Sequence, residues 1–351
     1  MRIVVNDIAA SKGGALTVLR DFYNCVKEND TENEWIFLLG DRILEETDNI
    51  KIMTLPKIKN SRIKKLTFDL FTGKKFMKKL NPDVIFSLQN TAVFGVKVPQ
   101  IIYLHQSIPF QTIKKFSFFK SSERSLAVYQ HFIGRVIKKS VKVCDKVIVQ
   151  TKWMKDAVCK QCRVSKDKVL RVTPTVADIS SYDTSHPFNK NLFFYPTASG
   201  IYKNNDAIFK ACEILSQAHN DFVVTLTLPE NQSRNNIHCV GRLPYGEVIE
   251  KYAQSTLIFP SYIETFGFPM AEARKVGTIV LASDCPFSRE VLEGYENAYF
   301  FDPFKPEELA ALMERVVLGD IEKKISSEAA TDHSDSWLLI FKEVINYKHN
   351  N

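Results

Sequence analysis

Short apolar runs alternate with helix-type segments along this chain, and this alternation constrains the fold more than any other feature. In the first half, such runs lie at residues 2–5, 35–39, 84–87, 98–104, 146–150 and 169–173. A helical pattern over residues 13–27 follows the first of them. Strands that alternate with helices predict a parallel sheet covered by helices on both faces.

The same alternation restarts after residues 174–190, a stretch with two prolines and several Ser, Asp and Thr residues that is typical of a linker. Strands are expected at 191–195, 222–228, 238–240, 256–259 and 278–282, and helices at 206–217, 247–253, 269–276, 306–317 and 335–347. The sequence therefore predicts two doubly wound α/β domains, over 1–173 and 191–330. Ligands of such sheets bind at the carboxyl ends of the strands, here in a cleft between the domains.

Length and composition fit a cytoplasmic globular protein. The 351 residues suffice for two domains, and 45% hydrophobic with 25% charged residues is an ordinary balance. No window of about 18 apolar residues predicts a membrane span, and MRIVVNDIAA lacks the apolar core of a signal peptide. The seven cysteines are scattered, so we expect reduced thiols, and the Cys159–Cys162 pair lacks the further ligands of a zinc site.

Charge is distributed unequally between the two halves. Residues 1–172 hold 32 Lys and Arg against 16 Asp and Glu, whereas residues 173–351 hold 15 against 24. The net charge of +7 thus combines a strongly basic first half with an acidic second half. Net charges of opposite sign in the two halves indicate two domains whose surfaces face different partners or environments.

Two segments concentrate the basic residues and interleave them with aromatic ones. Residues 57–79 hold nine Lys and Arg and one acid, Asp69, and residues 110–142 hold eight and one acid, Glu123. Basic segments with apolar residues bind anionic lipid headgroups, so we expect this half to lie peripherally on an anionic membrane surface. A solvated basic face is the plainer alternative. Nucleic acid, which basic and aromatic residues can also bind, is the alternative we favour least, and no such partner is expected.

Glu264 and Glu272 stand eight residues apart in SYIETFGFPMAEA, residues 261–273, an otherwise apolar and aromatic stretch. Pro269 suits the first position of a helix, which places Glu264 in the preceding loop and Glu272 in the first turn. A helix N-terminus holds phosphate readily. Glu264 can then accept hydrogen bonds from sugar hydroxyls and Glu272 from ribose hydroxyls. Alternatively, Glu272 only stabilises the helix start and Glu264 is a solvated loop residue.

The run from Glu264 to Glu272 resembles the E-x7-E signature of retaining glycosyltransferases with the GT-B fold, of the family-4 type (glycosyltransferase group 1). Similar motifs lie on both sides: CVGRLPYGEVIEKYAQSTLIFPS before it, and VGTIVLASDCPFSREV and NAYFFDPFKPEELA after it. The likeness is close over residues 238–315 and looser elsewhere. It implies that domain 1–173 binds the acceptor, that domain 191–330 binds a nucleotide sugar, and that segment 331–351 carries a helix crossing back to the N-terminal domain.

The resemblance also implies roles for single residues. In YPTASGIYKNND (195–206), Lys203 matches the lysine of the family's R-x4-K diphosphate pair, whereas Ala198 stands where the arginine is expected. Arg242 is the candidate that replaces it. His105 matches a histidine expected near the donor sugar, and Gln106 follows it where an aspartate is common.

Further donor contacts are implied around these residues. The donor site is expected to include the four residues between Glu264 and the predicted helix start at Pro269, namely Thr265, Phe266, Gly267 and Phe268. Gly13 and Gly14 match the family's glycine-rich first loop, where the backbone can approach a sugar phosphate. The loop lacks G-x-G-x-x-G, so a dinucleotide is not expected.

The implied reaction is a metal-independent transfer with retention of configuration, in which Glu264, His105 and Lys203 act at the reaction centre. The donor is a UDP-, GDP- or dTDP-sugar, and no cofactor is expected. The acceptor is expected to be a lipid-linked saccharide in bacterial O-antigen or capsule synthesis, met at the inner face of the cell membrane. A nucleotide-sugar epimerase of the same fold and a catalytically silent sugar-nucleotide-binding protein are the alternatives, and Ala198 favours the second.

Overall fold

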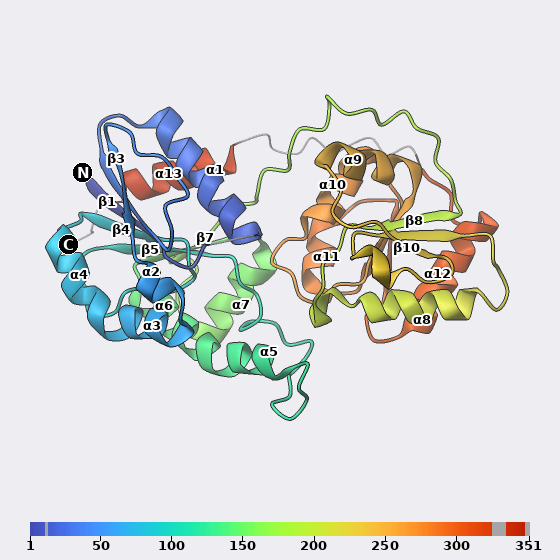
Figure 1. The fold of residues 1–351 in the computed structure, drawn as a ribbon, viewed down its shortest axis with the longest axis horizontal. Helices are drawn as coiled ribbons and strands as arrows, with labels where there is room; N and C mark the ends of the chain where they lie inside the picture. Colours follow the sequence, from blue (N-terminus) through green and yellow to red (C-terminus); the bar gives the residue numbers. More distant parts are fainter. Residues whose placement is uncertain (11–12, 325–334, 348–351) are drawn as a thin grey trace. The chain divides into compact units, whose positions relative to one another are not determined.

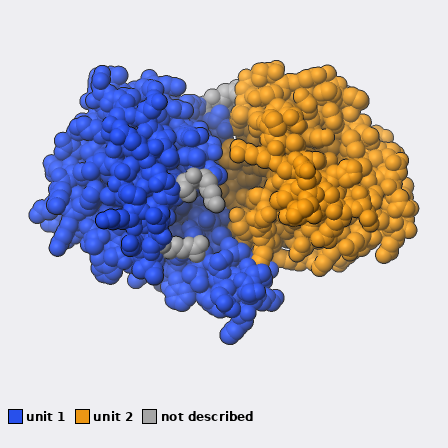
Figure 2. Space-filling model, viewed as in Figure 1, with its two compact units in different colours: residues 1–175, 333–351 blue, residues 176–332 orange. Residues whose placement is uncertain are grey.

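The computed structural model describes residues 1–10, 13–324 and 335–347. Contacts between residues divide the chain into two compact units: unit 1 comprises residues 1–175 and 333–351, and unit 2 comprises residues 176–332 (Figure 2). None of the helices in the described ranges is long and apolar enough to span a bilayer.

Unit 1 is built on a seven-stranded parallel sheet in the order β3-β2-β1-β4-β5-β6-β7 (Figure 1). The strands are β1 (Arg2–Asp7), β2 (Glu34–Leu39), β3 (Ile50–Thr54), β4 (Val84–Ser87), β5 (Gln100–Leu104), β6 (Lys146–Val149) and β7 (Val169–Arg171). The helices are α1 (Gly14–Asn29), α2 (Pro56–Lys59), α3 (Arg62–Thr67), α4 (Gly73–Leu80), α5 (Arg124–Val128), α6 (Gly134–Val143), α7 (Lys152–Cys162) and α13 (Ser336–Ile345). Single π-turns, η1 (Phe68–Thr72) and η2 (Tyr129–Ile133), join α3 to α4 and α5 to α6.

Both faces of this sheet are buried. Ile3 and Val5 of β1 enter the core that includes residues of α1 and α13, whereas Val4 packs with Phe68 and Met77 on the opposite face. Successive side chains of a strand point to opposite faces, so a sheet covered on both sides needs apolar residues at every position. This is why the strands of unit 1 appear in the sequence as continuous apolar runs.

Helix α13 comes from the end of the chain and packs within unit 1. Its Phe341 stacks on Trp35 of β2 with 6.0 Å between ring centroids, and its Trp337 lies 6.0 Å from Phe22 of α1. The side chain of Asp335 caps the helix by accepting hydrogen bonds from backbone N–H groups of the first turn. The core of unit 1 is therefore completed by residues that follow all of unit 2 in the sequence.

Unit 2 is a six-stranded parallel sheet in the order β10-β9-β8-β11-β12-β13. Its strands are β8 (Leu192–Tyr195), β9 (Val223–Leu226), β10 (Ile237–Cys239), β11 (Thr256–Phe259), β12 (Val280–Ser283) and β13 (Ala298–Phe301). Its helices are α8 (Asn205–Leu215), α9 (Tyr245–Gln254), α10 (Phe268–Val276), α11 (Pro286–Val291) and α12 (Pro306–Leu318), with short 3₁₀-helices η3 (Ile201–Lys203) and η4 (Glu230–Gln232). Helices α9, α10 and α11 cover one face, and α8 and α12 cover the other (Figure 1).

The segment predicted as a linker, residues 174–190, belongs mostly to unit 2. Lys275 Nζ donates hydrogen bonds to the backbone oxygens of Val176 (3.0 Å) and Ala177 (3.3 Å). The ring of Tyr182 packs edge-on to that of Tyr245, with 5.6 Å between centroids. These contacts attach the segment to α9 and α10.

The prediction of two doubly wound α/β folds is confirmed, and every predicted strand occurs, with bounds that match or differ by a few residues. The prediction missed the edge strands β3 and β13. In β3 only Ile50 and Ile52 are buried, and Lys51 and Met53 are exposed, so no continuous apolar run marks the strand. An edge strand has one neighbour and a more open surface, which allows polar residues to interrupt it.

Candidate active site

The strand order of unit 2 reverses between β8 and β11, which are adjacent and parallel. Ligands of doubly wound sheets bind beyond the carboxyl ends of the strands at such a reversal. The segment after β8 ends in η3, and the segment after β11 leads into α10. Hydrogen bonds join them: the Tyr262 N–H donates to the backbone oxygen of Tyr202 (3.0 Å), and the Asn204 side chain donates to that of Pro260 (3.2 Å).

Lys203 and Glu264, one from each of these segments, form an ion pair with 2.6 Å between Lys203 Nζ and Glu264 Oε1. Their side chains are only 25% and 19% exposed. The hydroxyl of Ser261, which is fully buried, lies 2.9 Å from the same carboxylate oxygen. A cation and a hydroxyl therefore fix the position of the Glu264 carboxylate.

The charge of Lys203 is maintained by its partner. Burial disfavours the ammonium, but the Glu264 carboxylate outweighs this effect and raises the pKa of Lys203 above its usual range. The Tyr195 hydroxyl donates to the backbone oxygen of Lys203 (3.3 Å), and burial raises the pKa of this phenol. Lys203 is thus a fixed cation at neutral pH, supported by an uncharged tyrosine.

Helix α10 begins at Phe268, four residues after Glu264 and one residue earlier than predicted. Gly267 caps it with φ of 97°, and a Cβ added there would lie 2.6 Å from Met270 Cε. Only glycine adopts this conformation without strain. Pro269 has no N–H, and the Met270 N–H donates to the backbone oxygen of Gly267 (3.0 Å). The start of the helix carries partial positive charge, which suits an anionic group.

Glu272 lies in the second turn of α10, which corrects the prediction that places it in the first turn. Its two carboxylate oxygens accept hydrogen bonds from the phenols of Tyr245 (3.3 Å) and Tyr252 (3.2 Å), both on α9. Burial raises the pKa of Glu272, and the two phenols lower it. Because each carboxylate oxygen can accept more than one hydrogen bond, Glu272 retains capacity for a hydroxylated ligand.

The remaining predicted donor residues of unit 2 differ in their burial and in their contacts. Phe266 is buried and packs edge-on to Phe268, which is 41% exposed, with 5.2 Å between ring centroids, and Thr265 is half-buried. Arg242, between β10 and α9, is exposed and forms no ion pair with any residue of the described ranges. Ala198 is exposed in the loop after β8 and offers no side chain to an anion.

His105, Gly13 and Gly14 belong to unit 1. The His105 backbone N–H donates to Asn90 Oδ1 (2.8 Å), and its ring lies 5.7 Å from that of Tyr103. Packing around the imidazole lowers the pKa of His105 to about 4, so the ring is neutral at physiological pH. Gly13, with φ of 62°, and Gly14 begin α1 in open space. The roles of these three residues toward a donor stay predictions.

Three residues that contact the two glutamates were not predicted from the sequence: Ser261, Tyr245 and Tyr252. Both tyrosines lie seven residues apart on α9, which places them on the same face of the helix and is the signal that pairs them. Within the described part of the chain, no cluster of three or more His, Cys, Asp or Glu side chains is arranged to hold a metal ion.

Comparison with known proteins finds a family match over part of unit 2. Residues 229–333, which contain β11, Glu264 and α10, match the family described as glycosyl transferases group 1. The chain is 26% identical over 176 residues to the O-antigen chain mannosyltransferase RfbU of Salmonella typhimurium. That alignment covers 47% of this chain and 48% of RfbU, so the chain matches about half of its curated relative.

Solved structures resemble the whole chain. WaaG, a glycosyltransferase involved in lipopolysaccharide biosynthesis, is similar with a TM-score of 0.67 at 11% identity, over 98% of this chain and 100% of WaaG. Anabaena Alr3699/HepE in complex with UDP-glucose is similar with a TM-score of 0.62 at 15% identity, over 98% and 95% of the two chains. At these identities the likeness concerns the fold. The chain has the GT-B fold, and its residues 229–333 match the family described as glycosyl transferases group 1.

Proposed function

We propose that this chain is a retaining glycosyltransferase that moves a sugar from a nucleotide-sugar donor to a hydroxyl group of a lipid-linked saccharide. The acceptor is an intermediate of a bacterial surface polysaccharide, such as an O-antigen or capsule. Support comes from the family match over 229–333, from the O-antigen mannosyltransferase relative, and from the fold shared with a protein crystallised with UDP-glucose. The nucleoside of the donor is uridine, guanosine or deoxythymidine.

The observation that carries the proposal is the Lys203–Glu264 ion pair at the reversal of strand order, beside the N-terminus of α10. Glycosyl transfer leaves negative charge on the departing diphosphate. A cation and a helix N-terminus aimed at that charge stabilise the transition state, which is the largest effect available to such an enzyme. A carboxylate held beside the cation is suited to accept hydrogen bonds from sugar hydroxyls.

In the proposed mechanism, the acceptor oxygen bonds to the anomeric carbon on the face from which the nucleoside diphosphate leaves. The bond between that carbon and the phosphate oxygen breaks, and the acceptor proton passes to the leaving phosphate. Glu264 orients the sugar and forms no covalent bond to it. Lys203 and the start of α10 bind the diphosphate, with Arg242 as a further cation in place of Ala198, and Glu272 binds the ribose. No divalent metal takes part.

We also propose that the enzyme works peripherally at the inner face of the cell membrane, through the basic surface of unit 1. Each basic segment, 57–79 and 110–142, contains one acid, and both acids are buried: Asp69 is 3% exposed and Glu123 is 5% exposed. The outer surface of both segments therefore presents only positive charge to its surroundings.

Thermal melting with UDP, GDP and dTDP identifies the donor base, since a nucleotide that binds only the folded state raises the melting temperature. Release of nucleoside diphosphate is then measured with the matching sugar donor, with and without a lipid-linked saccharide acceptor. Acceptor-dependent release with one glycosylated product is expected. Sugar inversion without stoichiometric release would identify an epimerase, and binding without turnover would identify a silent sugar-nucleotide-binding protein.

A further inference from the structure

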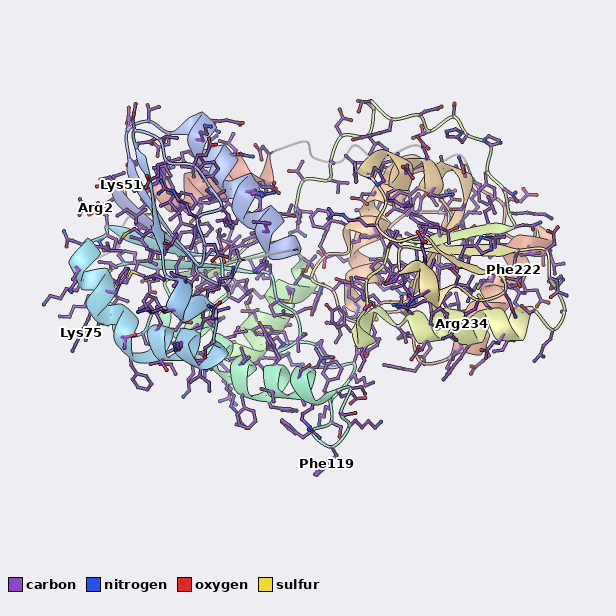
Figure 3. The ribbon with its side chains drawn as sticks, in the orientation of Figure 1. Arg2, Lys51, Lys75, Phe119, Phe222 and Arg234 are labelled. Carbon is purple, nitrogen blue, oxygen red and sulfur yellow. The ribbon has the colours of Figure 1, made fainter. Side chains whose placement is uncertain are left out.

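Three phenylalanines of unit 1 are exposed in one place, and the proposed transfer chemistry uses none of them. We call Phe118, Phe119 and Phe132 the aromatic tip; their exposed fractions are 38%, 95% and 56%. Phe119 stands at the end of a loop that projects beyond α5, with its ring directed away from the protein (Figure 3). Large apolar side chains exposed together on a soluble surface mark a site of interaction.

The aromatic tip is held in place by the protein around it. Phe118 packs edge-on to Phe132, with 5.9 Å between ring centroids. Arg124 Nε donates a hydrogen bond to the backbone oxygen of Phe118 (3.1 Å). Within the same loop, Ser117 N–H donates to Glu123 Oε2 (2.9 Å). The exposure of Phe119 is therefore maintained by defined contacts of its own loop.

In segment 110–142, which carries the aromatic tip, the exposed charge is of one sign. The only carboxylate of segment 110–142, Glu123, is buried and pairs with Lys114 at 3.1 Å. The hydrogen bond from Ser117 and then the pairing with Lys114 lower the pKa of Glu123, so it remains an internal anion. The exposed charged residues of this segment are all basic, namely Lys115, Lys120, Arg124, Arg135, Lys139 and Lys142.

We infer that the aromatic tip inserts into the boundary between headgroups and acyl chains of an anionic bilayer, while the surrounding basic residues bind the lipid headgroups. Apolar side chains ringed by Lys and Arg are the pattern of interfacial membrane binding. Nucleic acid fits less well, because bases stack on flat faces, and Phe118 and Phe132 lie at 70° to one another. The inference rests on the proposed function only in that a lipid-linked acceptor gives the enzyme a reason to bind a bilayer.

The test uses the full chain in flotation with vesicles of phosphatidylcholine and with vesicles that also contain phosphatidylglycerol. Binding is expected only to the anionic vesicles and is expected to fall with salt, because surface charges are screened. Phe119→Ser is expected to weaken binding about tenfold or more, since it removes the aromatic side chain that would leave water and enter the bilayer. Arg124→Gln is expected to weaken it about fivefold. Leu318→Ser, which changes a 54% exposed residue at the end of α12 in unit 2, is the matched control and should bind as the unchanged protein does.

A second variant places a reporter in the aromatic tip. In Phe119→Trp, the indole is expected to be quenched by lipids brominated in their acyl chains, and unquenched without vesicles. Vesicle binding that is absent, or equal in Phe119→Ser and the unchanged protein, overturns the inference. Loss of single-stranded oligonucleotide binding or of self-association in Phe119→Ser, with vesicle binding intact, also overturns it by assigning the aromatic tip to another partner.

The vesicle-binding test and the test of the proposed function can succeed or fail independently of one another. Transfer to a water-soluble acceptor analogue should be the same in Phe119→Ser and in the unchanged protein, because Phe119 lies in unit 1 outside the proposed catalytic group. Absence of transfer in both proteins overturns the proposed function and leaves the vesicle result standing. Lost vesicle binding with intact transfer supports both.

Discussion

At the scale of single residues, Glu264 is already bound to a cation and a hydroxyl before any donor enters. Exchange to Gln removes the charge that Lys203 pairs with and retains the side-chain volume. We expect Glu264→Gln to lower the rate of transfer about 100-fold, as for the loss of one preorganised electrostatic contact. Acceptor-dependent release of nucleoside diphosphate measures this. The exposed Glu293 supplies the control, since Glu293→Gln should leave the rate unchanged. Near-normal transfer by Glu264→Gln would remove Glu264 from the mechanism.

Tyr252 provides a second residue-scale prediction, because its buried hydroxyl supports the Glu272 carboxylate. Tyr252→Phe removes one hydrogen bond from the largely buried carboxylate of Glu272. We expect a loss of about 2 kcal/mol in the free energy of unfolding, a further rise in the pKa of Glu272, and a higher KM for the donor. Tyr245→Phe should have a smaller effect, since Tyr245 is only half-buried. Urea denaturation and donor titrations compare the two; equal effects would contradict the assigned roles.

Asp7, at the end of β1, gives a prediction on pH. Its side chain is 2% exposed, and burial raises its pKa to about 7, although the Ala10 N–H and Lys65 lower it. The unfolded carboxyl titrates near 3.8. As the pH falls through about 7, only the folded state takes up this proton, so the group makes folding more favourable until the unfolded state is protonated as well.

Asp7→Asn should therefore be more stable than the unchanged protein above pH 7, by an amount that shrinks as the pH falls toward 3.8. Urea denaturation across this range measures the difference in the free energy of unfolding. Asp48→Asn, at an exposed position, should give a difference of nearly zero at every pH. A difference for Asp7→Asn that does not change with pH would show that the buried carboxyl does not titrate as described.

At the scale of elements, α10 depends on one backbone conformation. Gly267→Ala adds a Cβ to a residue with φ of 97° and brings it to 2.6 Å from Met270 Cε. Left-handed backbone costs a residue other than glycine about 1–2 kcal/mol, and relief of the contact shifts the helix start. We expect at least this loss in the free energy of unfolding, together with reduced transfer.

Gly294→Ala is the matched comparison for this variant. Gly294 has φ of 69° but open space around its position for a Cβ. Gly294→Ala should lower the free energy of unfolding only by the cost of the left-handed backbone, and its rate of transfer should be unchanged. Equal loss of stability and activity in the two variants would contradict a special role for the start of α10.

At the scale of the whole molecule, the last helix of the chain belongs to the core of the first unit. Phe341 is 4% exposed and stacks on Trp35. Phe341→Ala should lower the free energy of unfolding by about 3–5 kcal/mol through the cavity it leaves. Hydrogen exchange should then show lost protection in β1, β2 and α1, with α8 to α12 unchanged. Leu339 lies on the same helix but is 45% exposed, so Leu339→Ala should have little effect on the free energy of unfolding. Loss of protection confined to unit 2 would contradict this assignment.

The sequence by itself determined the local elements and the fold class of this protein. Continuous apolar runs fit strands buried on both faces, and Gly267 and Gly277 mark the ends of α10, where φ is positive in both. Such features depend on neighbouring residues, so they are visible in a short stretch of sequence. The motif around Glu264 and Glu272 also identified the segment that the family match covers.

Tertiary structure decided which side chains meet. Lys203 and Glu264 are 61 residues apart in the sequence and become partners because β8 and β11 are adjacent in the sheet. Tyr245 and Tyr252 reach Glu272 because α9 packs against α10. The exposure of Phe119 and the burial of Glu123 likewise depend on how the loop before α5 folds. Contacts of this kind are selected by strand order and helix packing, which the local pattern of residues does not encode.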